Sequence, residues 1–114
     1  MSRRDNLTLI EDILESAQKI KKYTIDYNFD TFIEDDRTQD AVVRNFEIIG
    51  EASSKVDPDF KFEYSSIPWR KLKGYRNRLI HEYFGVDYQI VWEIIQDVLP
   101  DLIERLEEIA SHNN

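Results

Sequence analysis

The stretch WRKLKGYRNRLIHEYFGVDY, residues 69–88, decides how the rest of the chain is interpreted. It contains a run of basic residues with no acidic residue among them, whereas the whole chain carries a formal net charge of −8. A concentrated basic segment in an acidic chain favours a local binding site for an anion, such as a phosphate or a nucleic-acid backbone. The basic residues are Arg70, Lys71, Lys73, Arg76 and Arg78.

Three side chains in this stretch have chemistry that suits a phosphodiester. Arg76 presents a permanently charged, planar fork of donors for phosphate oxygens. His81 can exchange a proton near neutral pH, and Tyr83 adds a phenol that can donate a hydrogen bond or be modified. Together with Asn77, these positions predict a phosphodiester-handling site. An ordinary amphipathic helix with a solvated basic face would produce the same spacing, so both interpretations stay open at this point.

Helical geometry adds a constraint on how these groups can meet. At about 3.6 residues per turn, Arg76 and His81 lie roughly 140° apart around the helix axis, whereas Asn77 and His81 share a face. Either the helix therefore ends near His81, or the working groups come from two copies of the chain, and both explanations can hold together. Gly85 is placed to stop such a helix, as glycines just past helix ends do.

The segment RNRLIHEY, residues 76–83, resembles the R-x4-H-x-Y motif of HepT-like toxins in the HEPN superfamily. Asn77 fits the polar residue that follows the arginine in those proteins. The resemblance extends back to Pro68-Trp69, forward through FGVDYQIVWEII, and to the earlier segment AVVRNFEIIGEA at residues 41–52. It covers nearly the whole chain in order and without large gaps.

The resemblance implies a homodimeric, metal-independent ribonuclease with a composite groove between two chains. In that groove His81 would be the acid/base, Arg76 would stabilise the phosphate, and Asn77 would orient His81 or the phosphate. The other basic residues of the stretch would hold backbone phosphates of the RNA, namely Arg70, Lys71, Lys73 and Arg78.

The resemblance also implies a partner that controls the enzyme. This partner would be a minimal nucleotidyltransferase antitoxin, forming a hetero-oligomer with the chain and adding AMP to Tyr83. Tyr83 could instead pack its ring against the bundle with only its hydroxyl exposed. Two other functions also stay open: a non-catalytic HEPN module that binds nucleotides or a nucleotidyltransferase, and a structural dimer with a basic rim.

Length and composition indicate one globular unit, and the resemblance implies that it is a single HEPN-like domain over residues 1–114. Hydrophobic residues make up 41% of the chain, and there is no cysteine for a disulfide or a thiolate metal site. The segment MSRRDNLTLIED lacks the features of a signal peptide, and no apolar run is long enough for a membrane span. We therefore expect a cytoplasmic protein with no cofactor and no metal. The acidic run 34–36 is expected to be a solvated helix end.

Apolar periodicity predicts four main helices. Their expected ranges are residues 5–27, Thr38 or Asp40 to about Val56, Ser66 to about His81 or Tyr83, and Tyr88 to about Ala110. Asp87 should cap the last helix, and Pro100 should bend or split it. The predicted fold is all-α, an antiparallel four-helix bundle with a kinked C-terminal helix.

The segments between these helices are also assigned from local patterns. Asp30 is expected to cap a short extra helical turn that holds Phe32 and Ile33. Residues 60–66 are expected to form an ordered loop, and residues 112–114 a mobile tail. Arg44, Glu47 and Glu51 lie at helical spacing, which indicates either a surface ion-pair ladder or a polar cluster beside the active groove.

Overall fold

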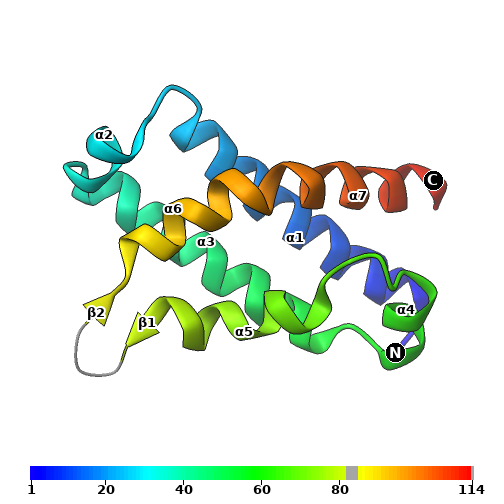
Figure 1. Ribbon diagram of the computed structural model, residues 1–114. Coiled ribbons are helices and arrows are strands. Elements are labelled where there is room, and N and C mark those ends of the chain that lie inside the picture. The colour runs from blue at the N-terminus through cyan, green and yellow to red at the C-terminus, as the bar shows by residue number, and fades with distance from the viewer. Residues whose placement is uncertain (82–84, 114) are drawn as a thin grey trace.

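The computed structural model describes residues 1–81 and 85–113, and the side chains of these residues except those at 76–78, 80 and 81. The long helices run alternately up and down, and together they form an antiparallel four-helix bundle (Figure 1). This confirms the predicted all-α fold. The four helical segments are α1 (Arg3–Thr24), α3 (Asp36–Lys55), α5 (Trp69–Leu79), and α6 (Tyr88–Asp97) continued by α7 (Leu99–His112).

Short elements join these helices. The turn expected around Phe32 is α2 (Phe29–Ile33), although its cap is Asn28 and not Asp30. α4 (Pro58–Glu63) lies where the sequence suggested an ordered loop. β1 (Ile80–His81) and β2 (Gly85–Val86) form a small antiparallel pair between α5 and α6, in which Ile80 faces Val86 and His81 faces Gly85.

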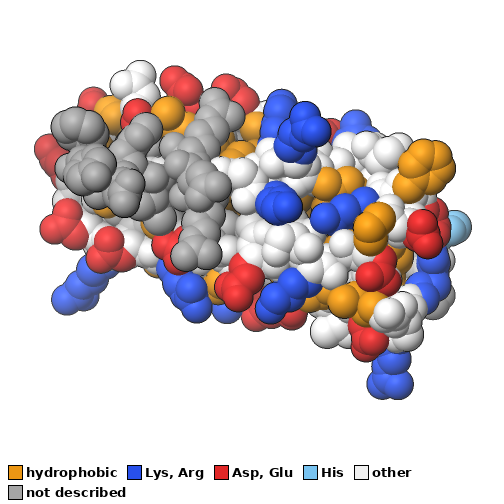
Figure 2. All heavy atoms as spheres, turned by 90° about the horizontal axis from the view of Figure 1, so that it is seen from below, with side chains coloured by type: hydrophobic (Ala, Val, Ile, Leu, Met, Phe, Trp, Pro, Cys, Tyr) orange, Lys and Arg blue, Asp and Glu red, His pale blue; other side chains and the backbone are white. Residues whose placement is uncertain are grey.

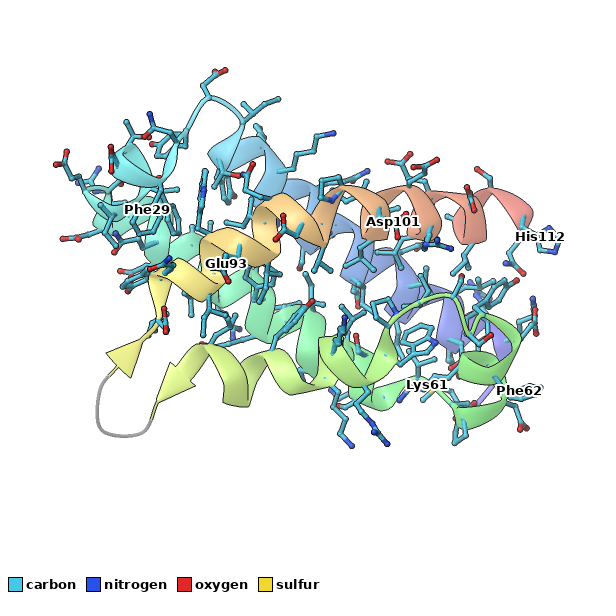
Figure 3. The ribbon with its side chains drawn as sticks, in the orientation of Figure 1. Phe29, Lys61, Phe62, Glu93, Asp101 and His112 are labelled. Carbon is cyan, nitrogen blue, oxygen red and sulfur yellow. The ribbon has the colours of Figure 1, made fainter. Side chains whose placement is uncertain are left out.

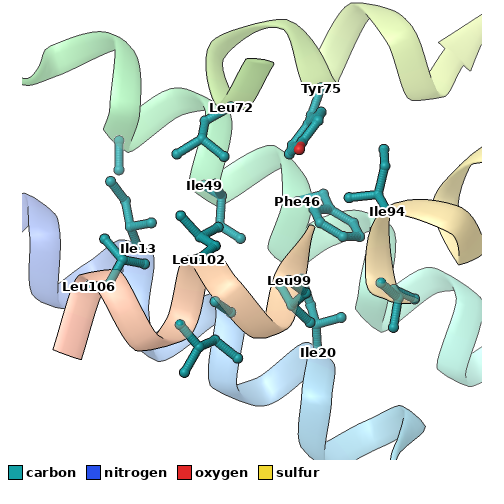
Figure 4. Packing of buried hydrophobic residues seen from close by; sticks show 14 of the residues in the cluster. Ile13, Ile20, Phe46, Ile49, Leu72, Tyr75, Ile94, Leu99, Leu102 and Leu106 are labelled. Carbon is teal, nitrogen blue, oxygen red and sulfur yellow. The ribbon is translucent and has the colours of Figure 1, made fainter. Parts of the chain in front are cut away.

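The core fills the space between α1, α3, α5 and α7, and it follows the apolar stripes predicted from the sequence. In Figure 4, Phe46 and Ile49 of α3 meet Leu72 and Tyr75 of α5, with Leu102 of α7 close by. The Phe46 and Tyr75 rings pack edge to face, with centroids 5.6 Å apart. Burying large apolar side chains of this kind stabilises a fold by about 1.5–3 kcal/mol each.

Side chains cap the starts of α1, α3 and α6, and three helices begin at other residues than predicted. α3 begins at Asp36, where Thr38 or Asp40 was expected, and α5 begins at Trp69, where a helix capped by Ser66 was expected. Ser2 caps α1 and forms a capping box with Asp5, so this helix begins earlier than expected from Asp5 or Asn6. Asp35 caps α3 by accepting a hydrogen bond from the Thr38 amide. Asp87 caps α6, as predicted, by accepting from the Ile90 amide at 3.2 Å.

The C-terminal helix is divided where the sequence indicated. α6 ends at Asp97 and α7 begins at Leu99, with Pro100 in its first turn. Proline is tolerated there because its missing amide proton would have no partner within the helix. The two segments still pack together, so the bend wraps this part of the chain over α1 and α5 (Figure 1).

The expected loop at residues 60–66 is wrong for its first half, which is helical. Pro58 occupies the first turn of α4, and Phe60 is buried while Phe62 points to solvent. The Trp69 indole Nε1 donates to the Lys61 and Tyr64 carbonyl oxygens at 3.2 and 3.1 Å. This indole closes the turn that follows α4 and fixes α4 against the start of α5.

The two ends of the chain meet beside α4. The Arg3 guanidinium donates to both Glu63 carboxylate oxygens, at 3.0 and 2.8 Å, and to Asn113 Oδ1. Asn113 Nδ2 in turn donates to the Tyr64 hydroxyl at 3.0 Å. α7 continues through His112, so the segment expected to form a tail from residue 112 begins inside a helix and is held at Asn113.

The carboxylates of Asp35 and Glu63 should make the stability of the fold depend on pH. Hydrogen bonds from the Tyr27 hydroxyl and from Thr38 lower the pKa of Asp35 from 3.8 to about 2. The hydrogen bonds from Arg3 lower the pKa of Glu63 from 4.5 to about 2. A lowered folded-state pKa contributes stability above the unfolded-state pKa, and this contribution is lost as the pH falls. The melting temperature should therefore fall between about pH 4.5 and pH 2.

Tyr27→Phe isolates one of these contributions, since it removes the largest cause of the Asp35 shift. Melting followed by circular dichroism should show a smaller loss of stability on acidification for this variant than for the wild type. Tyr23→Phe is the control, because Tyr23 is 38% exposed and makes no hydrogen bond within the described part of the chain. Identical acid profiles for Tyr27→Phe and the wild type would contradict the assignment.

Candidate functional site

The face of α5 that points away from the core carries the basic residues. Leu72, Tyr75 and Leu79 are buried to 1% exposure or less and hold the helix against the bundle. Arg70 and Lys73 are exposed, as is the flanking Lys71. Among the described residues, no carboxylate forms an ion pair with these cations. Their charge is therefore available to a ligand in solution.

The helix ends just before the histidine. α5 stops at Leu79, which places Arg76 and Asn77 in its last turn, and His81 lies beyond it in β1. The first of the two geometric explanations therefore holds: the helix ends two residues before His81, the earlier of its two expected ends, and does not reach Tyr83. Gly85 belongs to β2 and has φ of 76°, a conformation that favours glycine.

The strand pair is tied to both neighbouring helices. The Asp87 amide donates to the Leu79 carbonyl oxygen at 3.1 Å, and the Asp87 side chain then caps α6. Because α5 cannot continue past this closure, the backbone at His81 is set by the pairing with Gly85. Residues 76–81 therefore hold a helix end and the first strand, and residues 85–87 hold the second strand and the cap of α6.

Several predicted site residues cannot be placed further. The side chains of Arg76, Asn77, Arg78 and His81, and all of Tyr83, lie outside the described residues. The structure brings the backbone of Arg76 and Asn77 within a few residues of β1 on one end of the bundle. It places Arg70, Lys71 and Lys73 on the same helix as these positions.

A hollow borders the strand pair on its α2 side. It has a volume of about 440 Å³ and is lined by Phe29, Ile33, Gly85, Val86, Asp87, Tyr88 and Gln89. Phe32 packs beneath it against Tyr88 and Trp92, with centroid distances of 6.2 and 5.3 Å. Burial raises the pKa of the Tyr88 phenol, and the charges of Asp40 and Asp36 add to this shift.

Lys61 was missed in the sequence because its segment was expected to be a loop. Its Nζ lies 6.0 Å from the centroid of the Trp69 ring, and burial together with the charge of Lys73 lowers its pKa. Lys61 therefore extends the basic surface of α5 onto α4. The Asp57-Pro58 pair, a frequent start of a helix, is the signal that could have indicated α4.

Glu47 and Glu51, which lie at helical spacing from Arg44, both form ion pairs in the structure. Arg44 pairs with Glu47 at 3.7 Å and Glu51 pairs with Lys55 at 3.8 Å, all at exposed or half-buried positions. Such pairs contribute little to stability, which agrees with the surface-ladder interpretation.

Within the described residues no group of three or more histidine or acidic side chains could hold a metal ion. The same residues include no helix long and apolar enough to cross a membrane.

Comparison with known proteins gives the family. The model of the "Ribonuclease HepT-like" family matches residues 13–109. The chain is 40% identical over 109 residues to "Putative RNase MJ0127" of Methanocaldococcus jannaschii, covering 96% of this chain and 90% of that protein. It is 39% identical over 107 residues to "Probable ribonuclease HepT" of Thermococcus cleftensis, covering 94% and 97%.

A bacterial relative is similar over most of its length as well. "Putative RNase TTE0752" of Caldanaerobacter subterraneus is 38% identical over 100 residues, which cover 88% of this chain and 89% of that protein. No solved structure matches the chain significantly. The family match spans the bundle, the basic face of α5 and the strand pair that follows it. The chain belongs to the HepT-like ribonuclease family, and the enzyme class expected from the sequence, an RNase, is the one that this family supports.

Proposed function

We propose that the chain is a metal-independent endoribonuclease, the toxin of a toxin–antitoxin pair, that acts in the cytoplasm on RNA. The observation that carries this proposal is the course of α5. Its exposed cations, Arg70, Lys71 and Lys73, lead along the helix to the strand that bears His81. A ribonuclease needs this combination of a cationic path for the RNA backbone and a proton-transfer group at its end.

The reaction needs two proton transfers and one site of charge stabilisation. A base takes the proton of the ribose 2′-hydroxyl, whose oxygen then attacks the phosphorus. The bond from phosphorus to the 5′-oxygen breaks, and an acid gives that oxygen a proton. Between these steps the phosphate carries extra negative charge. In this proposal His81 serves as the acid/base, Arg76 stabilises the phosphate, and Asn77 orients one of them.

One chain supplies only one histidine in this region, whereas the reaction uses both a base and an acid. A two-fold dimer would supply His81 and Arg76 twice around one groove, since the same patch is present on both subunits. We therefore propose a homodimer in which the ends of the two α5 helices face each other. Arg78, with the three exposed cations of α5, would hold the flanking phosphates.

The first experiment tests activity and assembly together. Purified wild-type protein should cleave single-stranded RNA at the same rate with and without EDTA, because no step in the proposed reaction uses a metal. Light scattering at micromolar concentration should give the mass of a dimer. The control is His81→Ala protein purified in parallel, which exposes any contaminating nuclease. Activity that needs added metal, or a stable monomer that cleaves RNA, would contradict the composite site.

A further inference from the structure

The corner where α4 meets α5 carries an unusual pair of features. Phe62 is 86% exposed, the largest exposed fraction of any large hydrophobic side chain in the described residues. Its neighbour Lys61 lies over Trp69 and close enough to Lys73 for the two charges to influence each other. Figure 3 places Lys61 and Phe62 beyond the start of α5, at the end of the molecule opposite the strand pair.

The bundle does not need this arrangement for its own stability. An aromatic ring left in water gains none of the free energy that burial would give it, and two neighbouring lysines repel each other. Within the described part of the chain neither lysine has an acidic partner. Glu63, the acid next to Phe62, is already paired with Arg3. The corner is thus left with unbalanced positive charge beside an exposed ring.

Charge and ring together match single-stranded RNA. Proteins hold single strands by placing cations along the phosphates and stacking unpaired bases on exposed aromatic side chains. Folded double-stranded RNA offers no base face for such a ring. An acidic peptide would use the cations but would leave the ring without a specific role. The chemistry of the corner therefore favours an unpaired nucleotide.

The corner also lies in line with the proposed cleavage site. α5 has 11 residues, so about 16 Å of helix separates its two ends. Lys73 lies between them and, like Arg70 three residues earlier on the same face, is exposed. On the face seen in Figure 2, lysine and arginine side chains gather near the middle, with apolar surface among and beyond them. One extended strand could follow this path from the corner to the strand pair.

We propose that Phe62, Lys61 and Lys73 form a second RNA subsite, which stacks an unpaired base and binds its phosphate several nucleotides away from the cleaved bond. This inference rests on the proposed ribonuclease function and adds a preference for substrates with an unpaired extension. Trp69 acts as a positioning residue, because its indole fixes the α4–α5 turn and supports Lys61.

Binding of a labelled 2′-O-methyl single strand, which lacks the attacking hydroxyl, tests this subsite by fluorescence anisotropy. Phe62→Ala should weaken binding of a long strand by about 5-fold or more, the lower range for loss of one base stack. Phe62→Tyr should keep wild-type affinity. An abasic site at the stacked position should remove the difference between Phe62→Ala and the wild type. Lys61→Gln and Lys73→Gln should each reduce the salt slope by about 0.7.

The controls use matched residues at the other end of the bundle. Ile25→Ala removes an exposed apolar side chain, and Lys22→Gln removes an exposed lysine, so neither should change RNA affinity. If Phe62→Ala binds RNA as tightly as the wild type, the subsite is overturned. It is also overturned if light scattering shows that Phe62→Ala changes the mass of the dimer while its RNA affinity stays the same. Phe62→Ala should cleave a minimal RNA substrate, one too short to reach from the cleavage site to Phe62, at the wild-type rate. Absence of cleavage in the wild type itself would instead contradict the proposed function.

Discussion

His81→Ala and Arg76→Ala should each lower the rate of RNA cleavage by about 100-fold or more, the usual scale for loss of an acid/base or of charge stabilisation. The two variants should differ in their pH dependence. Arg76→Ala keeps the titrating imidazole and should retain the shape of the wild-type pH–rate profile. His81→Ala should lose the limb of the profile near neutral pH. Initial rates on a fluorogenic oligonucleotide across pH 5–9 give both results.

His112→Ala is the matched control for the histidine substitution. His112 is exposed at the end of α7, the end of the bundle opposite β1 (Figure 3). Its removal should leave the rate unchanged. Full activity in His81→Ala would show that another group transfers the proton, and equal loss in His112→Ala would show that the effect is not local.

A mixed dimer distinguishes one shared groove from two independent sites. When wild-type and His81→Ala chains with different affinity tags are co-expressed, the heterodimer carries a single His81. If one histidine is the base and its copy the acid, this heterodimer should be nearly as inactive as the homodimeric variant. Half of the wild-type rate would instead mean that each chain works alone.

Addition of AMP to Tyr83 should abolish cleavage. A phosphodiester-linked nucleotide at Tyr83 adds negative charge and bulk two residues after His81. Its phosphate could pair with Arg76 and take the place of the substrate phosphate, by the same charge-assisted hydrogen bonds that would bind RNA. Co-expression with a minimal nucleotidyltransferase encoded beside this chain, followed by intact mass measurement, should show AMP increments and no RNase activity.

Other tyrosines provide the controls for this assignment. Tyr75 is 1% exposed, whereas Tyr23 is 38% exposed at the far end of α1. Tyr83→Phe should remove the increments and keep the fold, while Tyr23→Phe should be modified like the wild type. An increment that maps to Tyr23 or Tyr88, or no increment with a demonstrably active nucleotidyltransferase, would contradict the control by AMP addition to Tyr83 that the family resemblance implies.

Most of the bundle could be predicted because its stabilising interactions follow helical spacing. Ile10, Ile13 and Ile20 mark the buried stripe of α1, and each is fully buried. Pro100 divides the last helix for a local reason, the loss of an amide donor. Asp87 caps α6 through its own side chain. Each of these features depends on residues a few positions apart, so the sequence alone contains the relevant information.

The parts that were wrong depend on contacts between distant segments. α4 has only six residues, too few to show a period, and it is held by Trp69 from the following helix. α5 ends at Leu79 because Asp87, eight residues later, donates to the Leu79 carbonyl oxygen. A helical pattern continues smoothly past that point in the sequence, so periodicity alone predicts a longer helix.

The candidate site was predictable in its residue types and less so in its extent. Exposure of Arg70, Lys71 and Lys73 follows from the apolar stripe on the opposite face of α5. Lys61 joins this basic surface only because α4 folds against Trp69, and no local sequence pattern predicts that packing. How the groups around His81 meet depends, in our proposal, on a second chain, and one sequence contains no direct record of that geometry.

The packing of α1 against α7 has a consequence for the order of events during synthesis. α1 leaves the ribosome before the other helices, yet one of its two main partners is α7, the last of them. α1 can pack against α3, its other main partner, while the chain is being made, but the face of α1 that α7 covers stays open until α7 has been released. A nascent chain that carries the whole of residues 69–88 therefore holds α5 on α3 in a bundle that still lacks its last helix. For an enzyme that would attack RNA, this order delays completion of the bundle until its own message has been read to the end of α7.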